Sequence, residues 1–440
     1  MINFYKTNYY EQISEYMLFK ITAVLMIIML FYMYIKAIFP FLPFLKDFLI
    51  LLSFFVVFLS IASSGFRISK PNYLDKIVLI LFIYLMFQFI YTYLRTNNIF
   101  VTYYGFRLTY LPIFIYFIIK SIKNKKYRVK IDKIIITSLV IGCFITIIES
   151  LSLQMGIISP ELLATILDRK PMFLSGFTWT RVYGVVGTPH ITGVYNAILF
   201  SLLLFSIRKP LINLYYVHVR PFVKYKLTNE RKFLLIVSSL AVLISTSRTA
   251  WTILFLLLLI YPFINKKINF AIILKYFVLI IILLMLLIYF LRENLETSYL
   301  GFLIVYSAKF FESTFDVIQK SPFIGFGFEV GDYSKYLDIS NVSVENLTAG
   351  TELFLGQIFR MLGLVGIILY LCIFLVVPFV IIISNRLPRK IKIIAAPTLV
   401  IGISFGHYNP FESPTSAMCA WYFLALLSNE ISFNNQLKLV

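Results

Sequence analysis

Charged residues are scarce in this chain, and acidic residues are scarcer than basic ones. Only 14% of the 440 residues are Asp, Glu, Lys or Arg, whereas 60% are hydrophobic and 18% are aromatic. The mean hydropathy of +0.88 is far above that of a soluble globular protein. Most of the chain must therefore be solvated by lipid, which predicts a polytopic membrane protein.

Cysteine is nearly absent as well. The three cysteines, Cys143, Cys372 and Cys419, lie in or beside apolar stretches and lack the spacing of metal ligands. The chain also lacks a glycine-rich phosphate loop, a short-period repeat and a separate soluble domain. We therefore expect no disulfide framework, no metal site and no cofactor.

The first apolar run has no small-residue cleavage site and follows a polar stretch that contains Glu11 and Glu15. It is therefore interpreted as the first transmembrane helix and not as a signal peptide. A helix needs roughly 20 apolar residues to cross a bilayer, and about twelve such runs recur along the chain. They lie near residues 17–39, 46–65, 77–94, 104–120, 134–151, 189–207, 233–247, 249–264, 272–291, 354–384, 393–407 and 416–429.

These runs predict an all-α membrane protein in three parts. Residues 1–291 hold the first nine transmembrane helices, residues 292–353 form a large external loop with short helices, and residues 354–440 hold the last three transmembrane helices. The external loop is much more polar than the rest of the chain. A loop of this length in a compact protein is usually functional.

Lysine and arginine determine the predicted orientation, because cytoplasmic loops keep positive charge that translocated loops lose. The even-numbered loops are the basic ones, with the largest clusters in residues 120–133, 208–232 and 386–392. Both termini are therefore predicted to be cytoplasmic. Basic loops beside anionic headgroups account for most of the formal net charge of +20, so no nucleic-acid partner is expected.

Two arginines fall on the predicted outer side, where positive charge is normally scarce. Arg248 lies in a polar stretch between two apolar runs, and Arg181 opens a segment rich in glycine that leads into predicted helix six. A guanidinium offers a planar fork of donors to phosphate oxygens, and a helix N-terminus adds partial positive charge. The pair predicts an anion site, although an interfacial anchor explains either arginine taken alone.

Other polar residues in or beside apolar runs are further candidates. Arg360 lies about two turns into predicted helix ten, where an arginine pairs with a neighbour, snorkels to the interface or lines a watery cavity. His407, in the predicted outer loop before the last helix, is either structural or catalytic. Of the remaining histidines, His190 is expected to cap predicted helix six and His218 to be solvated.

Within the external loop, residues 312–320 have the pattern of a short amphipathic helix. Gly325 and Gly327 follow it and permit a tight backbone path, which makes this segment a candidate substrate loop. The aromatic residues Phe326 and Phe328 are expected either to stack on sugar rings or to belong to an interfacial aromatic belt.

Four motifs, taken in this order, resemble the O-antigen polymerase and O-antigen ligase superfamily. The order, spacing and topology agree over about residues 170–370, whereas the first five helices agree in hydropathy only. The motifs are Arg181 with Gly184, Gly187 and Pro189; Ser247 with Arg248; Pro322 to Gly327; and the stretch from Glu352 and Leu355 to Gly363 and Gly366.

This resemblance implies a GT-C-like glycosyltransferase in the bacterial cytoplasmic membrane that uses undecaprenyl-diphosphate-linked oligosaccharide on the outer face. Arg181 and Arg248 match the two arginines that are taken to hold the lipid diphosphate in that family, and Arg360 is a third candidate for this site. Membrane lipids, a flippase and a chain-length regulator are the expected partners.

One departure from the family pattern separates its members. Ligases carry a His-Asn pair where this chain has Thr351 and Glu352, which disfavours a ligase and is compatible with a polymerase. Glu352 and His407 are then the candidate general bases, and Glu352 could instead be a structural carboxylate.

Three other functions remain as alternatives. They are a ligase-type glycan transferase, a polyisoprenoid-linked oligosaccharide flippase or other transporter, and a non-catalytic partner in envelope assembly. Transporters often place broken polar helices at mid-membrane, whereas the polar groups of this chain gather on one face and in one loop. That distribution favours chemistry on the outer face.

Overall fold

A computed structural model describes the protein at residues 2–39, 41–63, 71–166, 182–206, 227–264, 314, 317–328, 354–384, 386–405, 409–411 and 413–437. These described residues form helices and connecting turns, and no β-strand occurs among them. The expected all-α architecture is therefore confirmed for this part of the chain.

The helices follow the predicted apolar runs. Every run except 272–291, which lies outside the described residues, coincides with one helix or with consecutive helices. The helices are α1 (Ile2–Leu30), α2 (Tyr32–Ile38), α3 (Leu42–Ser63), α4 (Tyr73–Thr96), α5 (Ile99–Thr109), α6 (Ile113–Ser121), α7 (Lys125–Gln154), α8 (Pro160–Ile166), η1 (Gly184–Val186), α9 (Pro189–Ser206), α11 (Leu227–Ile244), α12 (Arg248–Ile264), α14 (Phe354–Leu371), η4 (Cys372–Val376), α15 (Val377–Ile383), α16 (Arg389–Ser404) and α17 (Pro414–Leu437).

Three described stretches are long and apolar enough to cross a membrane, namely α4, α7 and the continuous run Phe354–Ile383. Helices α9 and α12 contain shorter apolar stretches. The total of about twelve spans stays a prediction.

Helix α4 shows how such a helix is solvated. Its buried face points into the bundle, and its opposite face is a continuous apolar stripe. Exposed apolar area of this extent is rare on soluble monomers, so lipid is the solvent that fits it. The exposed residues are Leu79, Ile80, Ile83, Phe87, Ile90 and Leu94.

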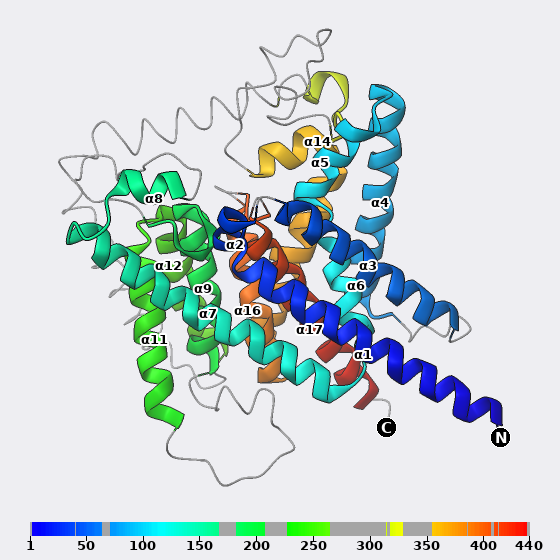
Figure 1. The fold of residues 1–440 in the computed structure, drawn as a ribbon, viewed down its shortest axis with the longest axis horizontal. Helices are drawn as coiled ribbons and strands as arrows, with labels where there is room; N and C mark the ends of the chain where they lie inside the picture. The colour runs from blue at the N-terminus through cyan, green and yellow to red at the C-terminus, as the bar shows by residue number, and fades with distance from the viewer. Residues whose placement is uncertain are drawn as a thin grey trace.

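One predicted helix is a pair of helices. The run 104–120 was expected to be continuous, but α5 ends at Thr109 and α6 begins at Ile113. Pro112 explains the break, because proline lacks the N–H that a helix interior needs and disfavours helical backbone in the residue before it. The two helices remain close in space to α4 (Figure 1).

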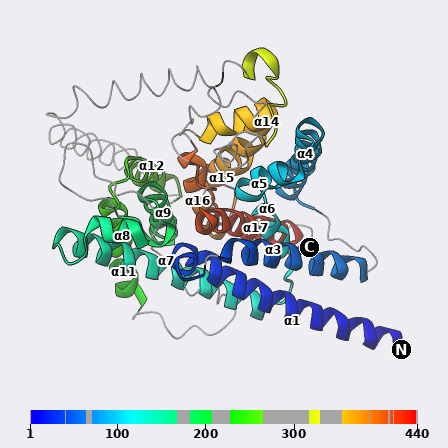
Figure 2. The ribbon, with the colours of Figure 1, turned by 45° about the horizontal axis from the view of Figure 1, so that its top comes forward.

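Helix α17 lies in the middle of the bundle and packs against α1, α6 and α16. Figures 1 and 2 show α4 at one edge of the molecule and α11 and α12 at the opposite edge, with α16 and α17 between them. The side chains of α17 from Thr415 to Ala425 are buried, as expected for a central helix.

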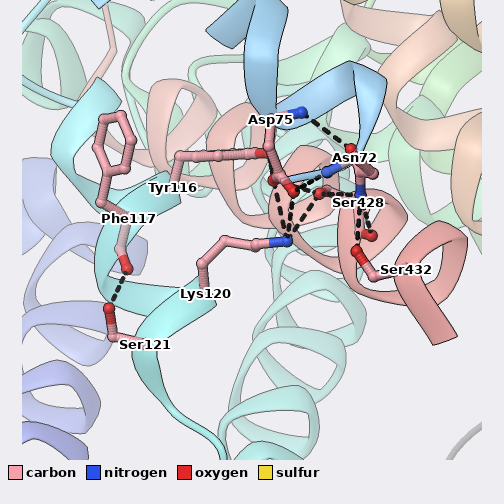
Figure 3. Close-up of polar contacts among 8 residues, drawn as sticks. All are labelled: Asn72, Asp75, Tyr116, Phe117, Lys120, Ser121, Ser428 and Ser432. Carbon is pink, nitrogen blue, oxygen red and sulfur yellow. Dashed lines mark hydrogen bonds and ion pairs between the residues drawn. The ribbon is translucent and has the colours of Figure 1, made fainter. Parts of the chain in front are cut away.

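A polar cluster fastens the start of α4 to α6 and α17 (Figure 3). Asn72 and Asp75 form a capping box, in which each side chain accepts a hydrogen bond from the backbone N–H of the other. Asp75 also accepts a hydrogen bond from Tyr116 at 2.6 Å and pairs with Lys120 at 2.9 Å. Ser428 of α17 completes the cluster by donating to Asp75 at 2.6 Å.

We predict that Asp75→Ala lowers the free energy of unfolding by about 3 kcal/mol, because it leaves the ammonium of Lys120 without its carboxylate in a largely buried place. The side chains of Lys120 and Asp75 are 19% and 13% exposed. The control is Glu430→Ala, which removes the more exposed pair between Lys390 and Glu430 and should cost less than about 1 kcal/mol. Denaturant unfolding in detergent micelles measures the free energy of unfolding of both variants. An equal loss in Asp75→Ala and Glu430→Ala would contradict a stabilising role for the buried pair.

Candidate functional site

Two of the four sequence motifs are in direct contact. We call residues 182–193 and 245–250 the first motif pair. The hydroxyl of Ser247 donates a hydrogen bond to the carbonyl of His190 at 3.3 Å and accepts one from the N–H of Ala250, also at 3.3 Å. Ser247 therefore caps α12 and holds the start of that helix against the first turn of α9.

Glycine permits this close approach. A methyl group at Gly193 would stand 2.5 Å from Cβ of Ala250 and 2.6 Å from Oγ of Ser245, which is closer than side chains pack. At the other end of the same helices, the rings of Phe205 and Tyr261 stack with their centres 6.2 Å apart. Helices α9 and α12 are therefore parallel, and their N-termini lie together.

A buried carboxylate fixes the segment that leads into α9. Glu149 of α7 accepts hydrogen bonds from the N–H groups of Tyr183 at 2.6 Å and Gly184 at 2.9 Å. The hydroxyl of Thr192 donates to the carbonyl of Tyr183. Gly184 has a φ of 55°, in the left-handed region that favours glycine. The backbone that follows Arg181 is thus held by side chains of α7 and α9.

Glu149 was not among the residues expected from the sequence to be functional. The available signal was an acidic residue inside an apolar helix, which is costly in a membrane and usually functional.

The two arginines themselves are described only in part. Arg181 lies outside the described residues, immediately before Val182, and Arg248 is the first residue of α12, with its backbone described but not its side chain. Each helix N-terminus carries unpaired N–H groups and partial positive charge. The start of α9 and the start of α12 together therefore form a local environment that suits an anion.

The other two motifs also meet. We call Pro322–Phe328 and Arg360–Gly366 the second motif pair. Hydrogen bonds join their backbones because α14 kinks at Gly363, which leaves N–H and C=O groups without helical partners. They include bonds from the N–H of Phe326 to the carbonyl of Arg360 at 2.8 Å, from Gly327 to Met361 at 2.9 Å, and from Leu364 to Pro322 at 2.9 Å.

Two glycines make this docking sterically feasible. Gly363 has φ 61° and ψ −163°, a backbone conformation that is almost restricted to glycine. A methyl group there would overlap the carbonyl of Phe323, and a methyl group at Gly325 would stand 2.6 Å from the N atom of Gly363. The candidate substrate glycine Gly325 thus has a structural task at the kink, and its contact with substrate stays a prediction.

Side chains of α4 contact the same segment. Gln88 donates to the carbonyl of Ile324 at 2.7 Å. Arg95 donates to the carbonyl of Phe326 at 2.9 Å and lies over its ring at 5.6 Å. The second motif pair is therefore clamped between α4 and α14.

Two expectations from sequence need correction here. Phe328 is 2% exposed and packs on Tyr110 at 4.8 Å, so it belongs to the core and neither stacks on sugar nor lies in an interfacial belt. Arg360 is buried, which excludes snorkelling to the interface.

The helix expected over residues 312–320 is observed at residues 314 and 317–320, and its other residues lie outside the described part.

Both candidate bases, Glu352 and His407, lie outside the described residues, so their role as general base stays a prediction. Described residues close to them in sequence do meet. The ring of Phe354 packs on Phe405 at 4.8 Å and on Phe411 at 5.3 Å. The beginning of α14 therefore lies beside both ends of the segment that contains His407.

The described residues contain no group of three or more His, Cys, Asp or Glu side chains arranged to hold a metal ion. Comparison with protein families, curated proteins and solved structures finds no match to this chain. The described part of the protein is all-helical, has helices long and apolar enough to span a membrane, and brings four polar motifs together in two pairs.

We predict that Gly363→Ala lowers the free energy of unfolding by about 3 kcal/mol or more, because the methyl group meets backbone in a glycine-only conformation. Gly156→Ala is a matched control, since Gly156 also has positive φ, 68°, but open space around its Cβ position. Gly156→Ala should lower the free energy of unfolding by only about 1 kcal/mol. Denaturant unfolding in detergent compares the two variants, and a similar loss of stability in both would show that the kink at Gly363 is not tightly packed.

Proposed function

We propose that this protein is a surface-polysaccharide polymerase of the O-antigen type. It would be an inverting glycosyltransferase that joins undecaprenyl-diphosphate-linked repeat units on the outer face of the bacterial cytoplasmic membrane. The observation that carries the proposal is the contact between the start of α9, which follows Arg181, and the start of α12, which begins with Arg248.

This arrangement suits the leaving group of the proposed reaction. The hydroxyl of the acceptor sugar attacks the anomeric carbon of the donor, the bond from that carbon to the diphosphate oxygen breaks, and the diphosphate leaves with the electron pair. In the proposed site, the guanidinium groups of Arg181 and Arg248 would join the two helix N-termini and stabilise the negative charge that develops. Such pre-placed donors support this step by electrostatics alone.

The proton of the acceptor hydroxyl goes to a general base, for which Glu352 and His407 are the candidates. The contacts of Phe354 support a shared location, and the amide of Asn409 adds a hydrogen bond to Oε1 of Gln357 at 3.0 Å. Arg360, the third candidate for the diphosphate, belongs to the second motif pair, so a contribution at the starts of α9 and α12 stays a prediction. A carboxylate near a guanidinium stays ionised but becomes a weaker base.

The second candidate function is a transporter of lipid-linked oligosaccharide, and one observation favours it. The run Phe354–Ile383 is broken at Gly363 and contains a π-helical turn at Cys372–Val376. Broken helices of this kind form substrate sites in many transporters. A ligase is disfavoured by Thr351 and Glu352 at the positions of the ligase His-Asn pair.

Deleting the gene in its host and sizing the surface glycan separates these functions. If the protein is a polymerase, the deletion strain shows a single repeat unit on its carrier or anchor. If it is a ligase, the strain accumulates long polymer on undecaprenyl diphosphate. If it is a flippase, the strain accumulates lipid-linked repeat units on the cytoplasmic face. Either of the last two results would contradict the proposal.

Restoring the gene with Arg181→Ala or Arg248→Ala should give no polymer, while protein level and membrane insertion stay at the wild-type value. Loss of a transition-state donor typically lowers the rate by about 10²- to 10³-fold. Arg386→Ala, at an exposed arginine outside the motifs, is the control and should restore the full ladder. Wild-type polymer from either motif variant would overturn the diphosphate site.

Glu352→Gln and His407→Ala are tested in the same assay. The variant that fails to restore the polymer identifies the general base.

A further inference from the structure

The segment Pro322–Phe328 lies beside the middle of α4 and not beyond its end. The carbonyl of Ile324 accepts a hydrogen bond from Gln88 at 2.7 Å, and the hydroxyl of Tyr84 lies 3.3 Å from the same oxygen. Gln88 and Tyr84 precede Thr96, the last residue of α4, by eight and twelve residues, which is roughly 12 and 18 Å along the helix. Half of the hydrocarbon core of a bilayer is about 15 Å. Because α4 is long and apolar enough to cross a membrane, these contacts place the segment near mid-membrane.

Helix α14 gives the same depth. The N–H of Leu364 donates to the carbonyl of Pro322 at 2.9 Å, and the N–H of Val365 donates to the carbonyl of Phe323 at 3.3 Å. Leu364 follows Phe354, the first residue of α14, by ten residues, which is roughly 15 Å along the helix. Two neighbouring helices therefore place the segment at a similar distance from one side of the membrane.

The backbone of the segment is paired in the way that lipid requires. The N–H groups of residues 325–328 all donate, the last of them to Oγ1 of Thr92 at 2.8 Å. The carbonyls of residues 322–324 and 326 accept hydrogen bonds from backbone N–H groups of α14 and from side chains of α4. A non-helical backbone in hydrocarbon has no water to bond, so each unpaired group costs several kcal/mol there. A loop in water needs no such set of protein partners.

The polarity of the α4 side chains that hold the segment changes along the helix. Gln88 and Thr92 are neutral, whereas Arg95, next to the end of α4, is charged. No Asp, Glu, Lys or Arg occurs in α4 between Lys76 and Arg95, or within Pro322–Phe328. A charge is costly inside the hydrocarbon core and is accommodated at the interface. This gradient indicates that the segment leaves the core near Arg95.

The side chains that the segment and its neighbours expose are apolar. Phe323 is 64% exposed and Ile324 is 38% exposed. Leu364 of α14, whose N–H binds the segment, is also exposed. On α4, the exposed ring of Phe87 stacks on the ring of Tyr84 with the centres 6.3 Å apart. These side chains form an apolar surface around the segment, and lipid chains solvate such a surface better than water does.

We propose that Pro322–Phe328 re-enters the membrane from the side on which α4 ends, and that Phe323 and Ile324 contact the hydrocarbon chains of lipids. The sequence places this segment in an external loop, with Gly325 and Gly327 as candidate contacts for a substrate. At the proposed depth, the part of a lipid-linked substrate that reaches the segment is its hydrocarbon tail. The inference rests on contacts with α4 and α14 and does not depend on the proposed reaction.

The test measures the surroundings of a nitroxide label on the full-length protein in lipid nanodiscs. The label is attached to Phe323→Cys in a Cys372→Ser background, because Cys143 and Cys419 are buried. Electron paramagnetic resonance then gives its collision rates with oxygen, which concentrates in hydrocarbon, and with a polar nickel chelate, which stays in water.

Two positions on α4 serve as controls. Ile83 is 59% exposed and lies one residue from Tyr84, so Ile83→Cys reports lipid at the same depth. Asn97 is exposed just after the end of α4, so Asn97→Cys reports water or the interface. The ratio of oxygen to nickel collisions at Phe323 should match that at Ile83 within about twofold and exceed that at Asn97 about tenfold.

Two results would overturn the proposal. A ratio at Phe323 as low as that at Asn97 would place the segment in water, either outside the membrane or in a wet cavity. A low ratio at Ile83 as well would show that lipid does not surround α4 at this depth. If Phe323→Cys does not fold, Ile324→Cys carries the label instead, and the same two results would contradict the proposal.

Discussion

The hydroxyl of Ser247 holds the starts of α9 and α12 together, and the proposed chemistry depends on this contact. It accepts from the N–H of Ala250 and donates to the carbonyl of His190, so one side chain both caps α12 and ties it to α9. Gly193 allows the approach. Because the two helices are parallel, their positive ends face the same side, and a segment held by Glu149 leads into one of them. An anion site needs that convergence, which neither helix provides alone.

The second motif pair has a different physical basis. It is an interaction between backbones, made feasible by an unusual conformation at Gly363 and clamped by polar side chains of α4. Helices α15 and α16 lie between α12 and α14 in Figure 2, so the two pairs belong to different parts of one bundle. A polymerase must bring two large lipid-linked molecules together. A rigid segment at one place and the proposed anion site at another would serve such a task.

The sequence predicted the helices well, because the hydropathy of each segment depends only on the residues within it. The run expected at 189–207 is α9, Pro189–Ser206, and the run expected at 354–384 is Phe354–Ile383. It placed Arg181 and Arg248 at one anion site, but it did not predict that Pro322–Phe328 meets Arg360–Gly366, because that contact depends on packing between distant segments. The role of Glu149 was missed for the same reason, because it became visible only through a partner 34 residues away in the chain.

The most direct test of the account is an experimental structure of the protein in lipid nanodiscs with undecaprenyl diphosphate added. We expect density for the diphosphate at the starts of α9 and α12, within hydrogen-bond distance of Arg181 and Arg248 and of backbone N–H groups there. Density for the diphosphate at another place, or saturating ligand with no density between these arginines, would contradict it.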